Sequence, residues 1–372
     1  MRRTLPTRAA RTSRRRLLTS LLLVVPSVLG LALPASAENE ARAAPQPSTH
    51  AASVLPPPPL PETPPARRRR ERLSAVTSWL YQLRRIDAGA IADSNADLVV
   101  VDYAPDRIHG VELPFTRADV AAMQRKPDGS RRLVLAYLSI GEAERYRTYW
   151  SNAWYDVATR PAWLLDVNKA WDGNFPVRFW HPEWQAIIYG TPGAYLDRIL
   201  AAGFDGIYLD RADVFQELAG ENAAADREMA RFISRLSAYA RRIDPLALVV
   251  MQNAEELVQR PDVLSAIDAI AKEDLFHGVE HDEARNDPDM IRHSLADLRF
   301  AEARGLRILV VEYLSDAAAA RRAVDEARAL RFLPLIAERS LGTLEYAPAA
   351  GTPAPASPIG DAAPVPADPT AR

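Results

Sequence analysis

The sequence predicts a (β/α)8 barrel, an α/β fold in which eight parallel strands alternate with helices. About 275 residues remain between two Pro/Ala-rich ends, the usual size of such a barrel. Within them, short apolar runs alternate with segments of helical periodicity. Carboxylates follow several of these runs, as expected at the carboxyl-terminal mouth of a barrel, where active sites are built. Neither a GxGxxG turn nor a P-loop occurs to favour a nucleotide-binding sheet.

The first 37 residues are expected to be an export signal. Residues 2–16 are basic, residues 17–33 form an apolar core, and Ala35-Ser36-Ala37 is an A-x-A cleavage site, which predicts a mature start at Glu38. Residues 13–18 (SRRRLL) also resemble a twin-arginine signal. A retained membrane anchor is the alternative, although the apolar core is short for a span. We therefore expect a protein that is secreted or held in the periplasm or cell envelope, with no membrane span after cleavage.

Two further segments have compositions that cannot bury a core. Residues 38–72 are rich in Ala, Pro and Arg and predict an extended, disordered linker. Residues 347–372 are rich in Pro and Ala and predict a disordered tail. The folded domain is therefore predicted over residues 73–346, and we expect it to be a monomer.

Charge and cysteine content exclude several classes of function. The chain has a formal net charge of -2, but residues 1–72 contribute +9 and residues 347–372 contribute -1, so the middle carries -10. A domain this acidic repels nucleic acid and favours cationic ligands, although solubility alone also explains the sign. The chain has no cysteine, which excludes Cys nucleophiles, Cys-ligated zinc and thiol redox chemistry.

The secondary structure is predicted from the spacing of apolar residues. Short apolar runs predict eight strands, at residues 98–101, 133–138, 177–180, 207–209, 246–250, 267–271, 306–311 and 332–336. Apolar residues at helical spacing predict helices at residues 78–86, 116–123, 182–189, 195–202, 222–242, 289–304 and 316–330. Thr116 and Asn222 suit the N-cap positions of two of these helices. Eight such strands favour closure into a barrel over an open sheet.

The stretch from Gly203 to Phe215 carries the clearest functional signal. Gly203 suits the end of the preceding helix, because glycine tolerates positive φ. A buried strand follows and ends at Asp210, with Asp213 shortly after it. Such a strand fixes the Cα of Asp210, and the loop beyond it leaves the carboxylate facing a cavity. The alternative is that Asp210 is the N-cap of the next helix.

Polar side chains recur after the other predicted strands, and they are Asp102, Glu142, Gln252, Asn253, Glu273 and Glu312. Crowding this much negative charge into one cleft is costly unless it is used. Six of the seven Trp lie between residues 150 and 184. Trp faces stack on sugar rings, although Trp clusters more often serve packing. Carboxylates beside aromatic platforms indicate glycoside cleavage.

Three motifs resemble the endo-α-1,4-polygalactosaminidase family, glycoside hydrolase family 114: residues 137–144 (YLSIGEAE), residues 203–210 (GFDGIYLD) and residues 272–274 (KED). The resemblance covers nearly all of residues 75–346. It implies a secreted barrel that cuts α-1,4-linked galactosamine polymers, with catalytic carboxylates on strands four and six. These map to Asp210 and Glu273, with Asp274 as the alternative to Glu273. Such a polymer is cationic, which agrees with the acidic domain.

The predicted site is therefore a two-carboxylate glycosidase site. By analogy with other barrel α-glycosidases, Asp210 is expected to be the nucleophile and Glu273 the general acid/base of a retaining mechanism. Retention predicts carboxyl groups about 5 to 5.5 Å apart, with Asp210 ionised and Glu273 of raised pKa. Side chains expected to line the sugar subsites are Asp102, Tyr137, Glu142, Trp180, Asp213, Asn253, Glu312 and Tyr313. The alternative from another class is a non-catalytic extracellular polysaccharide-binding barrel.

Two other patterns predict polar loops, and we expect no metal and no cofactor. His277-Gly278-Val279-Glu280-His281 matches the H-x-x-E-H pattern of some zinc peptidases, but that chemistry needs both His on one helical face, and Gly278 lies inside the motif. The acidic residues between 282 and 289 lack EF-hand spacing. A Ser-His-Asp hydrolase is disfavoured, because no G-x-S-x-G elbow occurs.

Overall fold

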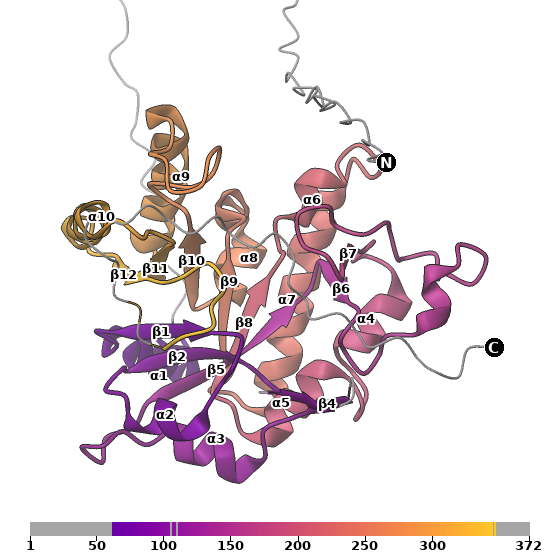
Figure 1. The fold of residues 1–372 in the computed structure, drawn as a ribbon, viewed down its shortest axis with the longest axis horizontal. Helices are drawn as coiled ribbons and strands as arrows, with labels where there is room; N and C mark the ends of the chain where they lie inside the picture. The colour runs from indigo at the N-terminus through magenta and orange to yellow at the C-terminus, as the bar shows by residue number, and fades with distance from the viewer. Residues whose placement is uncertain (1–61, 105, 109–110, 345, 347–372) are drawn as a thin grey trace, which may run out of the picture. The chain divides into compact units, whose positions relative to one another are not determined.

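The computed structural model describes residues 62–104, 106–108, 111–344 and 346. The predicted export signal, most of the predicted linker and the predicted tail lie outside these residues. Eight parallel strands form one sheet: β1 (Trp79–Gln82), β2 (Leu98–Asp102), β5 (Leu133–Ser139), β8 (Gly206–Asp210), β9 (Leu248–Gln252), β10 (Ala269–Glu273), β11 (Arg307–Glu312) and β12 (Leu333–Ile336). The last strand returns beside the first, where the Trp79 indole donates a hydrogen bond to the Leu333 carbonyl at 3.1 Å. The sheet is thus a nearly closed barrel, which confirms the predicted (β/α)8 class (Figure 1).

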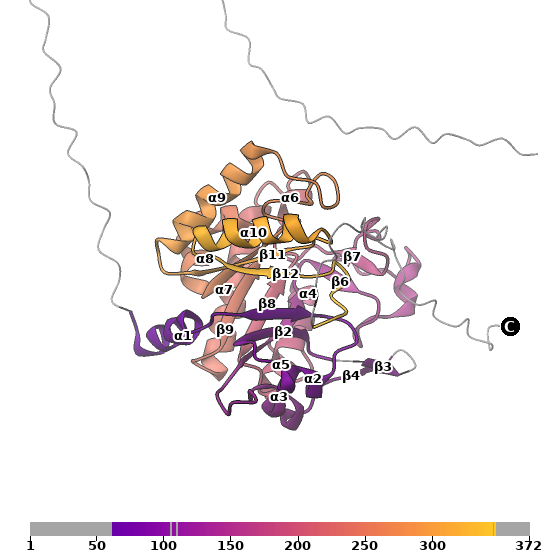
Figure 2. The ribbon, with the colours of Figure 1, turned by 60° about the vertical axis from the view of Figure 1, so that its left-hand side comes forward.

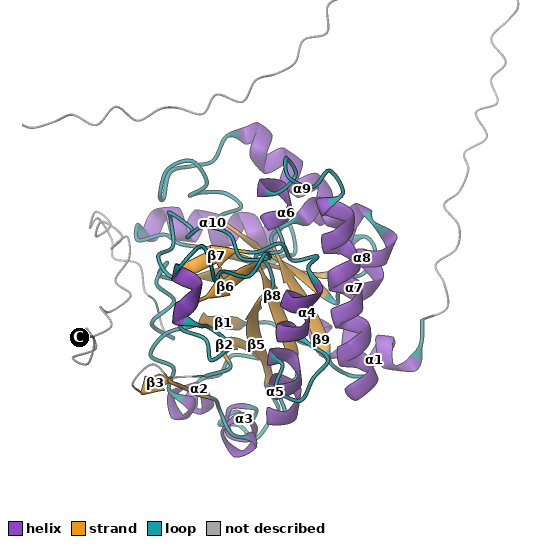
Figure 3. Ribbon diagram, turned by 90° about the vertical axis from the view of Figure 1, so that its right-hand side faces the viewer, coloured by secondary structure: helices purple, strands orange, loops and turns teal. Residues whose placement is uncertain are grey.

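Helices surround the strands, which occupy the centre of the view in Figure 3. They are α1 (Pro64–Ser74), α2 (Ala88–Asp93), α3 (Arg117–Met123), α4 (Pro182–Ile188), α5 (Tyr195–Ala202), α6 (Val214–Glu217), α7 (Ala225–Ile243), α8 (Pro261–Ala266), α9 (Pro288–Glu302) and α10 (Ala317–Ala329). Two short antiparallel pairs lie outside the barrel sheet: β3 (Asp106–Ile108) with β4 (Val111–Leu113), and β6 (Glu142–Glu144) with β7 (Asn174–Pro176). Within the described part of the chain, no helix is long and apolar enough to cross a membrane.

The side-chain alternation of each strand divides the core into two layers. One layer fills the barrel interior and includes Tyr81, Leu135, Tyr208, Val250 and Ala271. The other lies between the strands and the helices and includes Val99, Val134, Ile207, Met251 and Val310. Because successive residues alternate between these layers, the last inward-facing side chain of each strand lies at the carboxyl-terminal mouth.

Two predicted elements are wrong, although the strand count is unchanged. The predicted helix at 78–86 is strand β1, which pairs in parallel with β2 from Trp79 opposite Leu98. Its Trp79 and Tyr81 side chains both enter the barrel interior, as a period of two requires. The predicted strand at 177–180 is not in the barrel, because the chain before it forms β7 and pairs antiparallel with β6.

The segment expected to be a linker ends in structure. Helix α1 begins at Pro64 after the N-cap Thr63 and lies beside the starting ends of the strands (Figure 2). The Arg69 side chain is buried, with its guanidinium 2.9 Å from Asp268 and 2.8 Å from the Pro245 carbonyl. Arg72 pairs with Asp205 and donates to the Leu246 carbonyl at 2.8 Å. The composition of residues 64–72 hid this helix, because two of its arginines, Arg69 and Arg72, bind the barrel while the others are exposed.

Among the predicted helix boundaries, the N-cap Asn222 is wrong, because α7 begins at Ala225 and its N-cap is Ala224, but others are confirmed. Thr116 caps α3 and forms a capping box with Asp119. Asp316 caps α10 with its side chain. Gly203 follows α5 in the left-handed region at φ 90°, as predicted, and lets the chain turn directly into β8.

Candidate active site

Asp210 is the last residue of β8, two positions beyond the inward-facing Tyr208. Its Oδ1 accepts hydrogen bonds from the Arg211 backbone N–H at 2.7 Å and from Nε2 of Gln252 at 2.8 Å. Its Oδ2 accepts from the Tyr137 hydroxyl at 2.7 Å. Arg211 adopts a left-handed conformation at φ 57°, so the chain turns sharply after the carboxylate and α6 begins only at Val214. The alternative N-cap role is disfavoured, since the Asp210 side chain bonds within the barrel mouth.

Glu273 is the last residue of β10, two positions beyond the inward-facing Ala271. Its Oε2 accepts from Nε2 of Gln252 at 2.8 Å and from Nδ2 of Asn253 at 3.2 Å. Its Oε1 accepts from the Tyr313 hydroxyl. The Glu273 backbone N–H donates to Oδ1 of Asn253 at 3.1 Å. The Asn253 side chain therefore bonds both the backbone and the carboxylate of Glu273.

Gln252 connects the two carboxylates through one nitrogen. Each acceptor oxygen lies 2.8 Å from this nitrogen, so the two oxygens cannot be more than about 5.6 Å apart. The two N–H bonds of a primary amide point about 120° apart. The two acceptor oxygens, one from Asp210 and one from Glu273, are therefore roughly 5 Å apart. Gln252 was visible in the sequence as a polar residue at a strand end, but its link between two strands depends on register and was not predicted.

Burial raises the pKa of both carboxyl groups. For Asp210, burial and the nearby Glu273 charge together raise the pKa to about 7. For Glu273, burial also raises the pKa, and the hydrogen bond from Tyr313 opposes this effect. A raised pKa of Glu273 was expected, whereas the raised pKa of Asp210, which was expected to be ionised, was not. Two close carboxylates in one buried site retain a single shared proton towards neutral pH, and the pair titrates as a unit.

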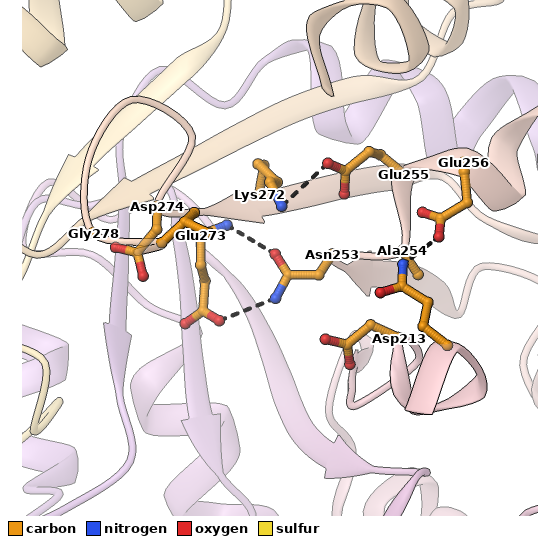
Figure 4. A pocket seen from close by; sticks show the side chains of 11 residues that line it. Asp213, Asn253, Ala254, Glu255, Glu256, Lys272, Glu273, Asp274 and Gly278 are labelled. Atoms are coloured by element: carbon orange, nitrogen blue, oxygen red, sulfur yellow. Dashed lines mark hydrogen bonds and ion pairs between the residues drawn. The ribbon is translucent and has the colours of Figure 1, made fainter. Parts of the chain in front are cut away.

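A pocket of about 290 Å³ opens beside Glu273 (Figure 4). Five carboxylates line it, namely Asp213, Glu255, Glu256, Glu273 and Asp274, together with Asn253 and one cation, Lys272. Lys272 pairs with Glu255 at 3.1 Å. The lining is therefore predominantly acidic, which favours a cationic ligand.

The structure brings four predicted subsite residues to this region. Tyr137 and Tyr313 bond the two carboxylates directly, and Asn253 both bonds Glu273 and lines the pocket. Asp213 also lines the pocket and lies 3.4 Å from the Arg211 guanidinium.

The other four predicted subsite residues contact protein groups. Asp102 pairs with Arg147 at 2.8 Å, and Glu142 pairs with Arg211 at 3.0 Å. Glu312 accepts from the Phe276 and His277 backbone N–H groups at 2.8 and 3.1 Å, which fixes the loop after β10. Trp180 is half-buried against Phe179, with ring centroids 5.0 Å apart.

A buried ion cluster near the mouth was not predicted. The Arg147 guanidinium is within 3.1 Å of Asp102, Glu112 and Glu144, and all four side chains are buried. Glu112 comes from β4 and Glu144 from β6, so only the folded chain brings them together. Nothing in the sequence around Arg147 distinguishes it from other arginines.

The remaining predicted alternatives have other partners. Asp274 adopts φ 50° and pairs with Arg339 at 3.0 Å, while Glu273 contacts the second carboxylate through Gln252. His277 is buried, with Nδ1 3.2 Å from Glu312. Among the residues that the structure describes, no group of three or more His, Asp or Glu could hold a metal ion.

A (β/α)8 barrel with two carboxylates this close at the ends of its strands has the architecture of a glycoside hydrolase. The model of Glycoside-hydrolase family GH114 matches residues 61–352. The chain therefore belongs to this family, as its three motifs predicted, and it is a glycoside hydrolase. The match begins just before α1, in agreement with the packing of that helix on the barrel.

Comparisons with individual proteins identify a sequence relative and two structures of similar fold. A protein of Deinococcus radiodurans is 35% identical over 279 residues, which cover 74% of this chain and 85% of the relative. The glycoside hydrolase domain of PelA from Pseudomonas aeruginosa superposes with a TM-score of 0.56 at 21% identity, covering 73% of this chain and 98% of that domain. Ega3 of Aspergillus fumigatus, solved in complex with galactosamine, gives a TM-score of 0.51 at 18% identity, covering 73% and 95%. At these identities the two structures support the fold alone.

Proposed function

We propose that this glycoside hydrolase cleaves an α-1,4-linked galactosamine polymer with retention of anomeric configuration. Asp210 is the nucleophile and Glu273 the general acid/base. The observation that carries the proposal is the shared donor: both carboxylates bond Nε2 of Gln252 at 2.8 Å. The two oxygens that share this donor, Oδ1 of Asp210 and Oε2 of Glu273, are therefore roughly 5 Å apart, which supports the close spacing of a retaining pair; an inverting pair would be about 6.5 to 9.5 Å apart to admit water.

The substrate class is supported by charge. The pocket beside Glu273 carries five carboxylates and one lysine, and residues 62–346, which include α1, have a formal net charge of -7. A polymer with free amines is cationic and is attracted to such a surface. Family membership points to the same substrate, and Ega3, a structural neighbour, was solved with galactosamine.

In the proposed reaction, Glu273 protonates the glycosidic oxygen while Asp210 attacks the anomeric carbon. The bond from that carbon to the leaving sugar breaks, and a covalent glycosyl–enzyme forms. Glu273 then removes a proton from water, and the water oxygen displaces Asp210 from the sugar. One proton shared by the pair is the required starting state, since one carboxyl group must be protonated and the other ionised.

Turnover on deacetylated galactosaminogalactan tests the proposal. We expect new reducing ends, with the α-anomer formed first in the NMR spectrum of the products. A protein that binds the polymer but releases no reducing ends would instead be a sugar-binding barrel. Initial formation of the β-anomer would contradict retention and leave the hydrolase function intact.

We also propose that the chain is exported and that its mature form begins at Glu38. The A-x-A site at 35–37 and the basic and apolar segments before it support this. Mass spectrometry of the protein from the culture medium and envelope fractions tests it. An intact N-terminus in a membrane fraction would indicate a retained anchor.

A further inference from the structure

The donors around Glu273 treat its two oxygens differently. A carboxylate oxygen can accept about two hydrogen bonds, one at each lone pair. The Oε2 atom accepts two, from Gln252 at 2.8 Å and Asn253 at 3.2 Å. Among the described residues, the Oε1 atom accepts from Tyr313 alone. One oxygen is thus saturated by amides, and the other retains an unused lone pair.

Asp210 shows the same asymmetry. Its Oδ1 accepts two N–H groups, from the Arg211 backbone at 2.7 Å and from Gln252 at 2.8 Å. Within the described part of the chain, its Oδ2 accepts from Tyr137 alone, at 2.7 Å. Each carboxylate therefore has one oxygen held by amide hydrogens and one oxygen held by a tyrosine hydroxyl.

The amide groups cannot be reversed to change this pattern. If the Gln252 amide were flipped, its oxygen would face two carboxylate oxygens, and the single shared proton could satisfy only one of these two contacts. If the Asn253 amide were flipped, its nitrogen would face the Glu273 backbone N–H, which now donates to Oδ1 at 3.1 Å. Both orientations follow from the neighbouring groups. An amide N–H only donates, whereas a hydroxyl can rotate and accept.

Resting on the glycosidase function proposed above, we infer that Oε1 of Glu273 carries the catalytic proton and Oδ2 of Asp210 forms the bond to sugar, with Tyr313 and Tyr137 as positioning residues. A proton on Oε2 of Glu273 would face the two N–H groups that already donate to this oxygen. A bond from Oδ1 of Asp210 to the sugar would displace the two N–H groups that donate to that oxygen. The tyrosine-bonded oxygens need only the rotation of one hydroxyl.

The reaction is balanced in these terms. In the first step the Oε1–H bond breaks and the proton moves to the glycosidic oxygen. The bond from that oxygen to the anomeric carbon breaks as Oδ2 bonds the carbon. In the second step water gives a proton to Oε1, its oxygen bonds the anomeric carbon, and the carbon–Oδ2 bond breaks.

The variants Tyr313→Phe and Tyr137→Phe test the assignment on two substrates. One is deacetylated α-1,4-galactosamine polymer, and the other is a nitrophenyl glycoside of a galactosamine oligomer, whose leaving group needs no proton. General acid assistance supplies roughly 10²- to 10⁴-fold in rate. We expect Tyr313→Phe to slow polymer cleavage by about tenfold or more and the nitrophenyl substrate by less than about threefold. Tyr137→Phe should slow both substrates by a similar factor, because it acts on the nucleophile.

Tyr239→Phe is the matched control. Tyr239 also donates to a carboxylate, that of Asp197, but it lies on α7, outside the strand ends. It should leave the rates on both substrates unchanged. If Tyr313→Phe slows the polymer and the nitrophenyl substrate by the same factor, as Tyr137→Phe should, the oxygen assignment is wrong.

A titration separates this inference from the proposed function, because it needs no turnover. In the ¹³C-carboxyl NMR spectrum, Tyr313→Phe should raise the pKa of Glu273, since the hydroxyl that stabilises its ionised form is lost. Tyr137→Phe should raise the pKa of Asp210. If the wild-type protein hydrolyses neither substrate, the proposed function fails and the titration still reports the partners. Titrations unchanged in both variants would overturn the assignment.

Discussion

Asp210 and Glu273 lie on two strands that are not neighbours, and one amide nitrogen of Gln252 bonds both of them at 2.8 Å. The strand that carries Gln252, β9, lies between β8 and β10 in the sheet. Because all three residues end their strands, the spacing of the carboxylates follows from the register of the barrel and from one side chain.

The Asp210→Asn and Glu273→Gln variants test the proposed roles. Asp210→Asn should reduce turnover on both polymer and nitrophenyl substrate by more than about 10³-fold, because no nucleophile remains. Glu273→Gln should abolish polymer cleavage and keep part of the activity on the nitrophenyl substrate. Polymer binding, measured by calorimetry, should survive in both variants. Polymer cleavage by Asp210→Asn at a near-normal rate would show that Asp210 is not the nucleophile.

Replacement of Gln252 by Glu should inactivate the enzyme without unfolding it. The shared donor becomes a third carboxylate that faces two others, so kcat should fall by about 10²-fold or more through charge repulsion and lost alignment. Gln259→Glu is the matched control, because Gln259 donates to Asp297 at 2.7 Å but is exposed to solvent. That variant should keep wild-type kcat. Normal turnover by Gln252→Glu would contradict the role of the shared donor.

The pH dependence of stability provides a test without substrate. The Asp210 and Glu273 carboxyl groups both have raised pKa values, so the folded state binds more protons than the unfolded state between roughly pH 4 and pH 7. Because of these two groups, the free energy of unfolding should fall as the pH rises through this window. Asp210→Asn should remove much of this fall in stability. At pH 7 we expect this variant to be more stable than wild type by roughly 2 to 4 kcal/mol.

Urea unfolding at pH 4.5 and pH 7 measures this difference. Asp166→Asn is the control, because the Asp166 side chain is 93% exposed, and it should follow the wild-type curve. If Asp210→Asn is no more stable than wild type at pH 7, ionising the buried Asp210–Glu273 pair does not cost the free energy of folding that the raised pKa values imply.

The sequence predicted the barrel and the position of Asp210 and Glu273 at the ends of strands because the relevant signals are local. Strands such as β2 and β8 are short apolar runs, and each ends on a carboxylate that period-two alternation places at the mouth. Strand β1 was misread because Trp79, Leu80, Leu83 and Ile86 also fit a helical spacing. Only pairing with β2 resolves that ambiguity.

The contacts that complete the site could not be predicted, because they join residues distant in the chain. The Arg147 cluster combines side chains from β2, β4 and β6. Glu312 was expected to face the sugar, yet it bonds backbone N–H groups 35 and 36 residues away. Partner choice of this kind depends on loop conformation, on which composition and periodicity give no information.

Helix α1 predicts a sharp boundary for truncation. Deletion of residues 38–61, whose composition cannot bury a core, should change the Tm by only a few degrees. Arg69→Ala should lower the Tm by roughly 5 to 10 °C, because the substitution removes a buried guanidinium and deprives Asp268 and the Pro245 carbonyl of its hydrogen bonds. Arg68→Ala is the control, since Arg68 is exposed on the same helix. Thermal melts that show no difference between the two variants would mean that α1 does not stabilise the barrel.

Asp274 and Glu273 are adjacent in the chain, and exchanging their roles is the simplest alternative for the acid/base. The structure separates them by partner: Asp274 pairs with Arg339 at 3.0 Å, whose guanidinium lies 4.6 Å from the centre of the Tyr313 ring. Asp274→Asn should therefore lower the Tm and leave polymer kcat within about tenfold of wild type, since the loss is one partly buried ion pair. Glu273→Gln should do the reverse, with an unchanged or higher Tm and loss of polymer cleavage. Asp274→Asn should thus change mainly the Tm, and Glu273→Gln mainly the polymer kcat. If Asp274→Asn instead abolishes polymer cleavage and keeps activity on the nitrophenyl substrate, the proton comes from Asp274.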